Sequence, residues 1–408
     1  MENLISLCKR RGFIYQGSEI YGGLAGTWDY GPLGVEIRHN IKQLWWKMFI
    51  SDMEEVYGLS SAIIMNPKVW EASGHAANFD DPLDDGGKFN VMFKTQVGAG
   101  EEAVTSYLRP ETAQGIFVNF KNVVDSFHPK MPFGIGQIGK AFRNEISPRD
   151  FIFRTREFEQ MEVEYFVSEK DWKKSFEKWR EKMQEFGKVL NLSNLHELEV
   201  DKSDRAHYSE RTIDFEFDYP FGRKELWGLA YRTDFDLRQH SASSGVGLEY
   251  FDEESGERFT PHVIEPSLGV DRTVLATLLS AYKEDNLGGE TRVYLKLPKS
   301  IAPIRVAVFP LLKNKPELVE KAREVYKMLK KEFSNVEFDD NGNIGKRYRR
   351  QDEIGTPFCV TIDFDTLGDP SKGSGQGTLE HKNTVTVRDR DTGEQKRVKI
   401  EDLKESIS

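Results

Sequence analysis

Cysteine is scarce in this sequence: Cys8 and Cys359 are the only two in 408 residues. They lie far apart and no Cys-x-x-Cys pair occurs, so the sequence predicts neither a disulfide framework nor a zinc site. No apolar run approaches the ~20 residues that a membrane helix needs. The amino terminus, MENLISLCKRRGF, places its basic residues after a very short apolar stretch, unlike a secretory signal. We therefore expect a cytoplasmic protein with two buried thiols.

An excess of basic residues is also missing. The net charge is −10 and the pI is about 5.5, which argues against a protein that coats nucleic acid by bulk charge, although a local basic surface remains compatible with these values. Hydrophobic residues make up 38% of the chain and charged residues 30%, as in globular proteins. The length predicts two or three domains.

Common nucleotide-binding and hydrolase motifs are absent. There is no Walker A or G-x-S-x-G pattern, and none of the eight histidines has the spacing of an H-E-x-x-H metal site. The segment Gly134–Gly139 fits G-x-G-x-x-G, but Lys140–Ile146 after it predicts a strand rather than the helix whose amino terminus would hold a pyrophosphate. The sequence therefore argues against a dinucleotide-binding fold.

Hydrophobic periodicity divides the chain near Pro298. Before it, we predict amphipathic helices up to about Glu55, from Ser168 to about Leu198 and after Gly269, with strands at Leu59–Met65, Thr212–Phe217 and Lys224–Arg232. Beyond it, strands alternate with helices, which predicts a small α/β domain with a mostly parallel sheet. The predicted domains are 1–297, with a helical insertion at about 168–215, and 298–408; Gly373–Gly377 is read as a surface loop.

The stretch Gly139–Val167 predicts a hairpin with one chemically rich face. Side chains alternate across a strand, so one face of the second strand carries Arg154, Arg156, Phe158, Gln160, Glu162 and Glu164. Arg143 and Glu145 share a face of the first strand, and Ser147–Asp150 has the residue types of the turn. Arginine binds phosphate, an aromatic ring stacks on a base, and carboxylates hold an ammonium or a metal. The hairpin thus suits ATP and an amino acid, with a solvated, salt-bridged sheet face as the alternative.

Two further observations concern charged residues: two glutamates in apolar segments and one run of basic residues. Glu225 and Glu265 lie in apolar, strand-like segments, where a glutamate needs a cation. Beside arginines they could hold Mg²⁺ against ATP phosphates, or they form buried ion pairs. The basic run Lys346–Arg350 suits phosphates or a base, and a solvated helix face is the alternative.

Long strings of the chain resemble a known family nearly from end to end. They include CKRRGFIYQGSEIYGGLAGTWDYGPLG, SSAIIMNPKVWEASGH, LRPETAQGIFVNF, GQIGKAFRNEISPRDFIFRTREFEQMEVEYF, HVIEPSLGVDRTV and YRRQDEIGTPFCVTIDFDT. The family is the class II aminoacyl-tRNA synthetases, specifically the bacterial-type homodimeric glycyl-tRNA synthetases. The resemblance implies an α+β fold, in which helices flank an antiparallel catalytic sheet and an α/β anticodon-binding domain follows. It also implies activation of glycine with ATP and Mg²⁺, and transfer of glycine to the 3′ end of tRNA-Gly by a homodimer.

The resemblance also assigns roles to residues. Arg143, Glu145 and Arg272 are implied to be catalytic, and the helix before Glu55 to build the dimer interface. The implied ATP-binding residues are Arg143, Asn144, Glu145, Phe153, Arg154, Arg156, Phe158, Glu225, Leu226 and Arg272. Those implied for glycine are Glu111, Phe158, Glu162, Glu265 and Ser267, with Glu225 and Glu265 as Mg²⁺ ligands and Arg347, Arg349 and Arg350 as tRNA contacts.

The chain departs from the family in one segment. Asp80–Phe89 passes directly across the place where bacterial members carry an inserted segment with a Cys-x-x-Cys. This favours adenylation over full-rate tRNA charging. Two other hypotheses remain: a catalytically impaired or non-enzymatic RNA-binding relative, and an enzyme that activates another small amino acid.

Overall fold

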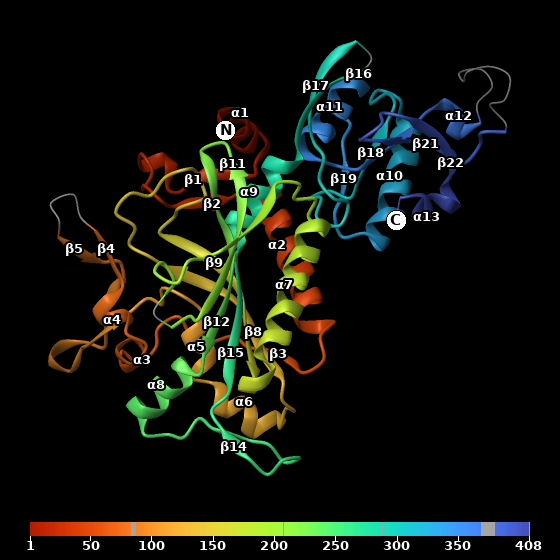
Figure 1. The fold of residues 1–408 in the computed structure, drawn as a ribbon. Coiled ribbons are helices and arrows are strands. Elements are labelled where there is room, and N and C mark those ends of the chain that lie inside the picture. Colours follow the sequence, from red (N-terminus) through yellow and green to blue (C-terminus); the bar gives the residue numbers. More distant parts are fainter. Residues whose placement is uncertain (83–86, 207, 288, 369–379, 408) are drawn as a thin grey trace. The chain divides into compact units, whose positions relative to one another are not determined.

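The structure is a computed structural model that describes residues 1–82, 87–206, 208–287, 289–368 and 380–407 (Figure 1). The chain forms two compact units. The larger unit comprises Gln16–Asp29 and Ile41–Ala276, and the smaller unit comprises Met1–Tyr15, Tyr30–Asn40 and Thr277–Ser408. The predicted loop at 373–377 lies outside the described residues. Within the described residues, no helix is both long and apolar enough to cross a membrane.

A seven-stranded sheet forms the centre of the larger unit. Its order is β10 (Leu195–Glu199), β11 (Arg211–Tyr219), β12 (Gly222–Thr233), β15 (His262–Gly269), β9 (Glu157–Val167), β8 (Phe133–Phe142) and β3 (Val56–Gly58). Every neighbouring pair is antiparallel except β3 and β8, which are parallel. The antiparallel sheet that the resemblance implied is therefore confirmed.

The helix α7 (Trp172–Val189) covers one face of this sheet (Figure 1). Its residues Phe176, Trp179, Met183 and Phe186 are buried, and the Trp179 ring lies 5.2 Å from that of Tyr165 on β9. The predicted helix is too long, because Leu195–Glu199 pairs with β11 instead. The segment 168–215, predicted as a helical insertion, thus contributes one helix and strands to the sheet layer itself.

Short helices pack at one end of the sheet. They are α5 (Ala113–Phe117), α6 (Phe120–Phe127) and α8 (Phe235–Ser244), with the strand pair β13 (Tyr250–Phe251) and β14 (Arg258–Phe259) beside them. Their core is aromatic: the Phe120 ring lies 4.8 Å from Phe166 and 5.9 Å from Phe133. Burial of these rings is the main force that fixes the helices on the sheet.

The segment before the sheet differs in part from its prediction. The predicted helix is present as α2 (Pro32–Trp46) with a π-helical turn at Lys47–Ser51. Its Trp45 is fully buried and stacks 5.3 Å from Phe49, so this ring belongs to the internal core. The predicted strand Leu59–Met65 is wrong: the chain leaves the sheet edge after β3, and only Ile64 makes a bridge, to Leu108. The helices α3 (Lys68–Ala72) and α4 (His75–Asn78) follow.

Two small hairpins lie between α4 and α5. They are β4 (Asp80–Pro82) with β5 (Lys88–Asn90), and β6 (Lys94–Val97) with β7 (Val104–Tyr107). The first lies where the resemblance implies an inserted segment in the family.

The glycines of β8 allow close packing and do not hold a phosphate. A Cβ atom on Gly136 would lie 2.4 Å from Ile50, and one on Gly139 would lie 2.1 Å from the Arg109 guanidinium. Arg109 in turn donates to the carbonyl oxygens of Lys140 and Ser61. The G-x-G-x-x-G pattern therefore reflects packing inside a strand.

The smaller unit contains a five-stranded sheet in the order β19 (Val336–Phe338), β18 (Val306–Pro310), β20 (Phe358–Ile362), β21 (Thr384–Asp389) and β22 (Gln395–Lys399). The strand β18 is parallel to both neighbours, but β21 and β22 are antiparallel, so the expected mostly parallel sheet is in fact mixed. Its helices are α10 (Pro316–Glu332), α11 (Ile344–Ile354), α12 (Phe364–Leu367) and α13 (Leu403–Ser406), with α1 (Glu2–Arg11) and the hairpin β16 (Tyr282–Leu287) and β17 (Glu290–Leu295) in the same unit.

Candidate active site

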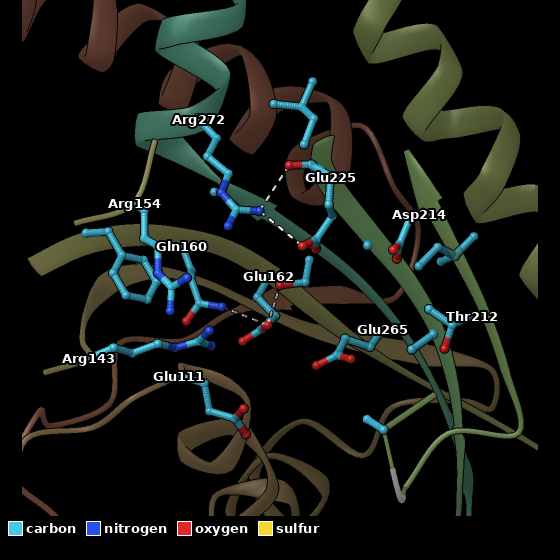
Figure 2. A pocket seen from close by; sticks show the side chains of 18 of the residues that line it. Glu111, Arg143, Arg154, Gln160, Glu162, Thr212, Asp214, Glu225, Glu265 and Arg272 are labelled. Atoms are coloured by element: carbon cyan, nitrogen blue, oxygen red, sulfur yellow. Dashed lines mark hydrogen bonds and ion pairs between the residues drawn. The ribbon is translucent and has the colours of Figure 1, made fainter. Parts of the chain in front are cut away.

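A cavity of about 380 Å³ opens on the sheet face opposite α7, within the larger unit (Figure 2). Strands β9, β11, β12 and β15 form its floor, and the loop after β8 forms one wall. Most of the predicted site residues line it: Glu111, Arg143, Glu145, Phe153, Arg154, Phe158, Glu162, Glu225, Leu226, Glu265, Ser267 and Arg272. The alternation of β9 explains this, since Phe158, Gln160 and Glu162 point to the cavity while Met161 and Val163 are buried beneath it.

Arginines lie on the side of the cavity formed by the loop after β8. The Cζ atom of Arg143 lies 5.3 Å from the ring centre of Phe158 and 5.2 Å from that of Phe79, and its Nε donates to the Pro110 carbonyl oxygen at 3.1 Å. Arg154 Nε donates to Glu145 Oε2 at 2.5 Å. These contacts hold both guanidinium groups in place before any ligand binds.

Arg272 enters from the first turn of α9 (Val270–Ala281). Its Cζ lies 4.4 Å from the ring centre of Phe153, and its Nη1 forms an ion pair with Glu225. The neighbouring Asp271 accepts a hydrogen bond of 2.9 Å from the backbone N–H of Glu159, which ties the helix to β9.

Two predicted ATP ligands do not line the cavity. Arg156 donates to the carbonyl oxygens of Glu145 and Ala25, so it holds the loop rather than facing the pocket. Asn144 donates its backbone N–H to the Val91 carbonyl oxygen at 2.7 Å. The alternation argument failed here because β9 begins at residue 157, and the tight turn lies at 150–153 rather than at the predicted 147–150.

The other end of the cavity is acidic. Glu162 Oε1 accepts a hydrogen bond of 2.6 Å from Ser267 Oγ, and its Oε2 accepts one from Thr112. Glu265 Oε1 binds Arg232 Nη1 at 2.7 Å. Glu111 contacts His75 Nε2 at 3.2 Å. Figure 2 shows Glu111, Glu162 and Glu265 on the side of the cavity away from Arg272.

These carboxyl groups differ in their proton affinity. Burial tends to raise the pKa of Glu111, but His75 and Arg232 outweigh it and the net pKa is lowered, so Glu111 is ionised at neutral pH. Burial, together with the charge of Glu111, raises the pKa of Glu162. Burial raises the pKa of Glu265 well above its usual range against the opposing effect of Arg232. The acidic end therefore gains from a cationic ligand group.

Several site residues were not predicted from the sequence. Arg232 is 1% exposed, binds Asp236 through Nε and Nη2 at 2.8 and 2.9 Å, and stacks 3.7 Å from the Tyr208 ring. Gln114 connects Glu111 with Asp236, at 3.0 Å to each. The available signal was an arginine directly after the apolar strand residues Leu229–Tyr231, where a cation must have buried partners.

Two carboxylates of the cavity wall suit Mg²⁺. Asp214 and Glu225 both line it, and the charge of Glu225 contributes to a raised pKa of Asp214, so the two carboxylates interact. Carboxylate oxygens that remain open to solvent and phosphates suit Mg²⁺. Glu265, the other predicted ligand, is held by Arg232 in the acidic end and fits an ammonium better.

The predicted tRNA contacts lie in the smaller unit on α11. Arg347 is buried and donates to the carbonyl oxygens of Pro310, Asp340 and Gly342. This burial argues against the prediction that Arg347 binds tRNA, because its guanidinium is used inside the fold. Arg349 pairs with Glu290 and Arg350 with Asp339, and both line a second cavity together with Lys346 and Arg388.

Comparison with known proteins shows which families match this chain. Residues 93–281 match the family described as tRNA synthetase class II core domain (G, H, P, S and T), and residues 305–408 match the anticodon binding domain. The chain is 48% identical to a glycine–tRNA ligase of Caldanaerobacter subterraneus over 99% of this chain and 96% of the relative. It is 46% identical to those of Clostridium tetani and Geobacillus thermodenitrificans, over 100% and 99% of this chain and 98% and 96% of the relatives.

These alignments run over 464 to 472 positions, more than the 408 residues of this chain, so the relatives contain residues that it lacks. This agrees with the short β4–β5 hairpin in place of an insertion. The matches cover the sheet, the cavity and the carboxy-terminal domain in one order, and the chain therefore belongs to the glycine–tRNA ligase family of class II aminoacyl-tRNA synthetases.

Proposed function

We propose that this chain activates glycine with ATP and transfers it to tRNA-Gly, and that the cavity described above is the active site. One observation carries the proposal: a single cavity is lined both by Arg143, Arg154 and Arg272 and by Glu111, Glu162 and Glu265, with Arg143 close to Glu111 (Figure 2). A triphosphate and an ammonium need these opposite charges side by side.

In the proposed complex ATP lies along the arginines. Phe158 offers an aromatic face for adenine, and Arg143, already fixed against that ring, reaches the α-phosphate. Arg154 and Arg272 bind the outer phosphates. Asp214 and Glu225 would hold Mg²⁺, which neutralises phosphate charge when it is bound.

Glycine lies in the acidic end. Its ammonium binds Glu111, Glu162 and Glu265, and Ser267 keeps Glu162 oriented. Walls close to the substrate Cα give specificity by overlap, since a pocket separates ligands that differ by one methylene by only about 1–3 kcal/mol unless the larger one has no room.

The chemistry needs positioning rather than a strong base. A carboxylate oxygen of glycine attacks the α-phosphorus in line, so that a new oxygen–phosphorus bond forms and the bond to the β-phosphate oxygen breaks, releasing pyrophosphate. Arg143 stabilises the charge that develops on the α-phosphate oxygens. A ribose hydroxyl at the 3′ end of tRNA then attacks the glycyl carbonyl carbon, and AMP leaves.

The remaining assignments also belong to this proposal. Arg349 and Arg350 are the tRNA contacts retained on α11, because their side chains line the basic second cavity. The chain acts as a homodimer, by resemblance to its family, in the cytoplasm, where its ATP and tRNA substrates are used for translation. We retain the boundary at 297/298 for the anticodon-binding domain.

Glycine-dependent ATP–pyrophosphate exchange tests the activity directly. We expect exchange with glycine and Mg²⁺, at most a trace with alanine or serine, and charging of tRNA-Gly in a separate assay. Absence of exchange under these conditions would reject the enzyme and favour an RNA-binding relative, whereas faster exchange with alanine would reject glycine as the substrate.

A further inference from the structure

Glu164 lies on β9 directly beneath the acidic end of the cavity. It is fully buried and does not line the cavity, although Glu162 on the same strand face does. Among the described residues, no hydrogen-bond donor reaches either carboxylate oxygen of Glu164. An ionised carboxylate in such a place is strongly unfavourable, whereas a protonated one needs only an acceptor.

Acceptors are close on two strands. One carboxylate oxygen from each of Glu162, Glu164 and Glu265 lies within 4.8 Å of the other two. Both oxygens of Glu162 already accept hydrogen bonds, and Oε1 of Glu265 accepts one from Arg232. Within the part of the chain that is described, Oε2 of Glu265 has no donor, so it is the acceptor that a proton on Glu164 would satisfy.

The charged groups around Glu164 also favour its protonated form. The ionisable groups that face it are Glu162 on β9, Glu265 on β15, Arg232 on β12 and Asp236 on α8. Arg232 already binds both Asp236 and Glu265. Another negative charge here would lack a cation of its own and would repel Glu265.

We propose that Glu164 is a positioning residue of the glycine site, which carries a proton at neutral pH and donates it as a hydrogen bond to Oε2 of Glu265. Glu265 is thereby held toward the substrate ammonium. This inference rests on the proposed function. It agrees with the pKa of Glu164, which burial and then the charge of Glu265 raise well above its usual range.

Two substitutions separate the roles of this side chain. Glu164→Gln keeps a neutral group of the same shape with a donor, and Glu164→Met keeps the length but has no donor. In the exchange assay at pH 7 we expect KM for glycine within about twofold of wild type for E164Q and raised about tenfold or more for E164M, with KM for ATP unchanged in both. Glu337→Gln is the matched control, because burial also raises the pKa of Glu337 but it lies in the smaller unit; it should leave KM for glycine unchanged.

The pH profile tests the proton itself. As pH rises, loss of the proton from Glu164 removes the hydrogen bond, so KM for glycine should rise in wild type more than in E164Q. The substrate ammonium titrates equally in both, and the ratio of the two KM values isolates Glu164. Infrared difference spectra at pH 7 should show a buried protonated carboxyl band that E164Q lacks.

A tenfold rise of KM for glycine in E164Q at pH 7, an unchanged KM in folded E164M, or no loss of the infrared band would each overturn the proposal. If wild type shows no glycine-dependent exchange, the proposed function fails, and the infrared comparison still decides whether Glu164 holds a proton.

Discussion

Arg272 Nη1 lies 3.1 Å from Glu225 Oε2 and donates a second hydrogen bond of 3.0 Å to the backbone carbonyl oxygen of the same residue. The two side chains are 31% and 50% exposed, and an ion pair this open to solvent contributes only about 0–1 kcal/mol to stability. Its value lies in orientation: together with a hydrogen bond from Nε to the Phe153 carbonyl oxygen, it fixes the guanidinium over the Phe153 ring at the cavity wall.

This relationship predicts that Arg272→Ala separates activity from stability. Loss of a fixed cation at the phosphate site should lower ATP–pyrophosphate exchange about a hundredfold or more. The melting temperature should hardly change. Arg223→Ala is the control, because Arg223 forms a comparably exposed ion pair with Asp218 outside the cavity. A drop in exchange of equal size for both variants would contradict the assignment.

Arg143 and Arg156 are predicted to differ although both come from the same loop. Arg143→Ala removes a guanidinium from the cavity and should reduce exchange about a thousandfold while the protein stays folded. Arg156→Ala removes hydrogen bonds to the Glu145 and Ala25 carbonyl oxygens, so it should lower the melting temperature and reduce exchange roughly tenfold or less. Single-turnover adenylate formation with circular dichroism melting distinguishes the two, and full activity of R143A would refute its role.

Arg232 is predicted to stabilise the acidic end of the cavity through its buried ion pairs with Asp236 and Glu265. Arg232→Met leaves Glu265 and Asp236 buried without their cation, which should lower the free energy of unfolding by about 3–5 kcal/mol. Arg180→Met, whose partners Glu177 and Glu197 are partly exposed, should cost about 1 kcal/mol or less. Urea unfolding of the two variants measures this, and equal losses would show that burial of the pair is not what matters.

The fold and the residues that line the cavity could be predicted from the sequence. The residues that hold those lining residues in place could be predicted less well. Strand alternation placed Phe158 and Glu162 on the cavity face because β9 is regular there. It misplaced Arg156, since alternation does not apply to the loop before a strand begins. Arg232 was missed because its partner Glu265 is brought to it by the fold, although its other partner, Asp236, stands only four residues away in the sequence. The burial of Arg347 was not foreseen for the same reason: exposure cannot be read from a run of basic residues.

Two residues of α11 should therefore behave differently in tRNA binding. Arg349→Ala should weaken binding and reduce the slope of log affinity against log salt by about one, with exchange unchanged. Arg347→Ala should instead destabilise the smaller unit by about 1–3 kcal/mol, because buried carbonyl oxygens lose their donor. Filter binding across a salt series, with melting curves, checks both. A reduced slope in folded R347A would restore the RNA role that burial argues against.

Asp214 makes stability depend on pH in a direction that can be measured. Burial raises its pKa to about 7, Glu225 and Glu216 add to the rise, and Arg272 opposes it. Below the usual aspartate pKa of about 3.9, the carboxyl is protonated in both folded and unfolded chains. Between that pH and about 7, only the unfolded chain ionises, so wild type should lose stability relative to Asp214→Asn as pH rises through this window; above it the difference should stay constant.

Urea unfolding of wild type and D214N from about pH 2 to pH 8 tests this sign. Asp218→Asn provides the opposite case, because Arg223 and His196 lower the pKa of Asp218, so wild type should be the more stable of that pair above pH 4 and lose its advantage in acid. If Mg²⁺ binds at Asp214 and Glu225, adding it with ATP should favour the ionised carboxylate. The pH range over which wild type loses stability relative to D214N should then shift to lower pH. A wild type/D214N difference that does not change with pH would show that Asp214 is ionised throughout, and that the Asp214–Glu225 pair is better solvated than its position in the cavity indicates.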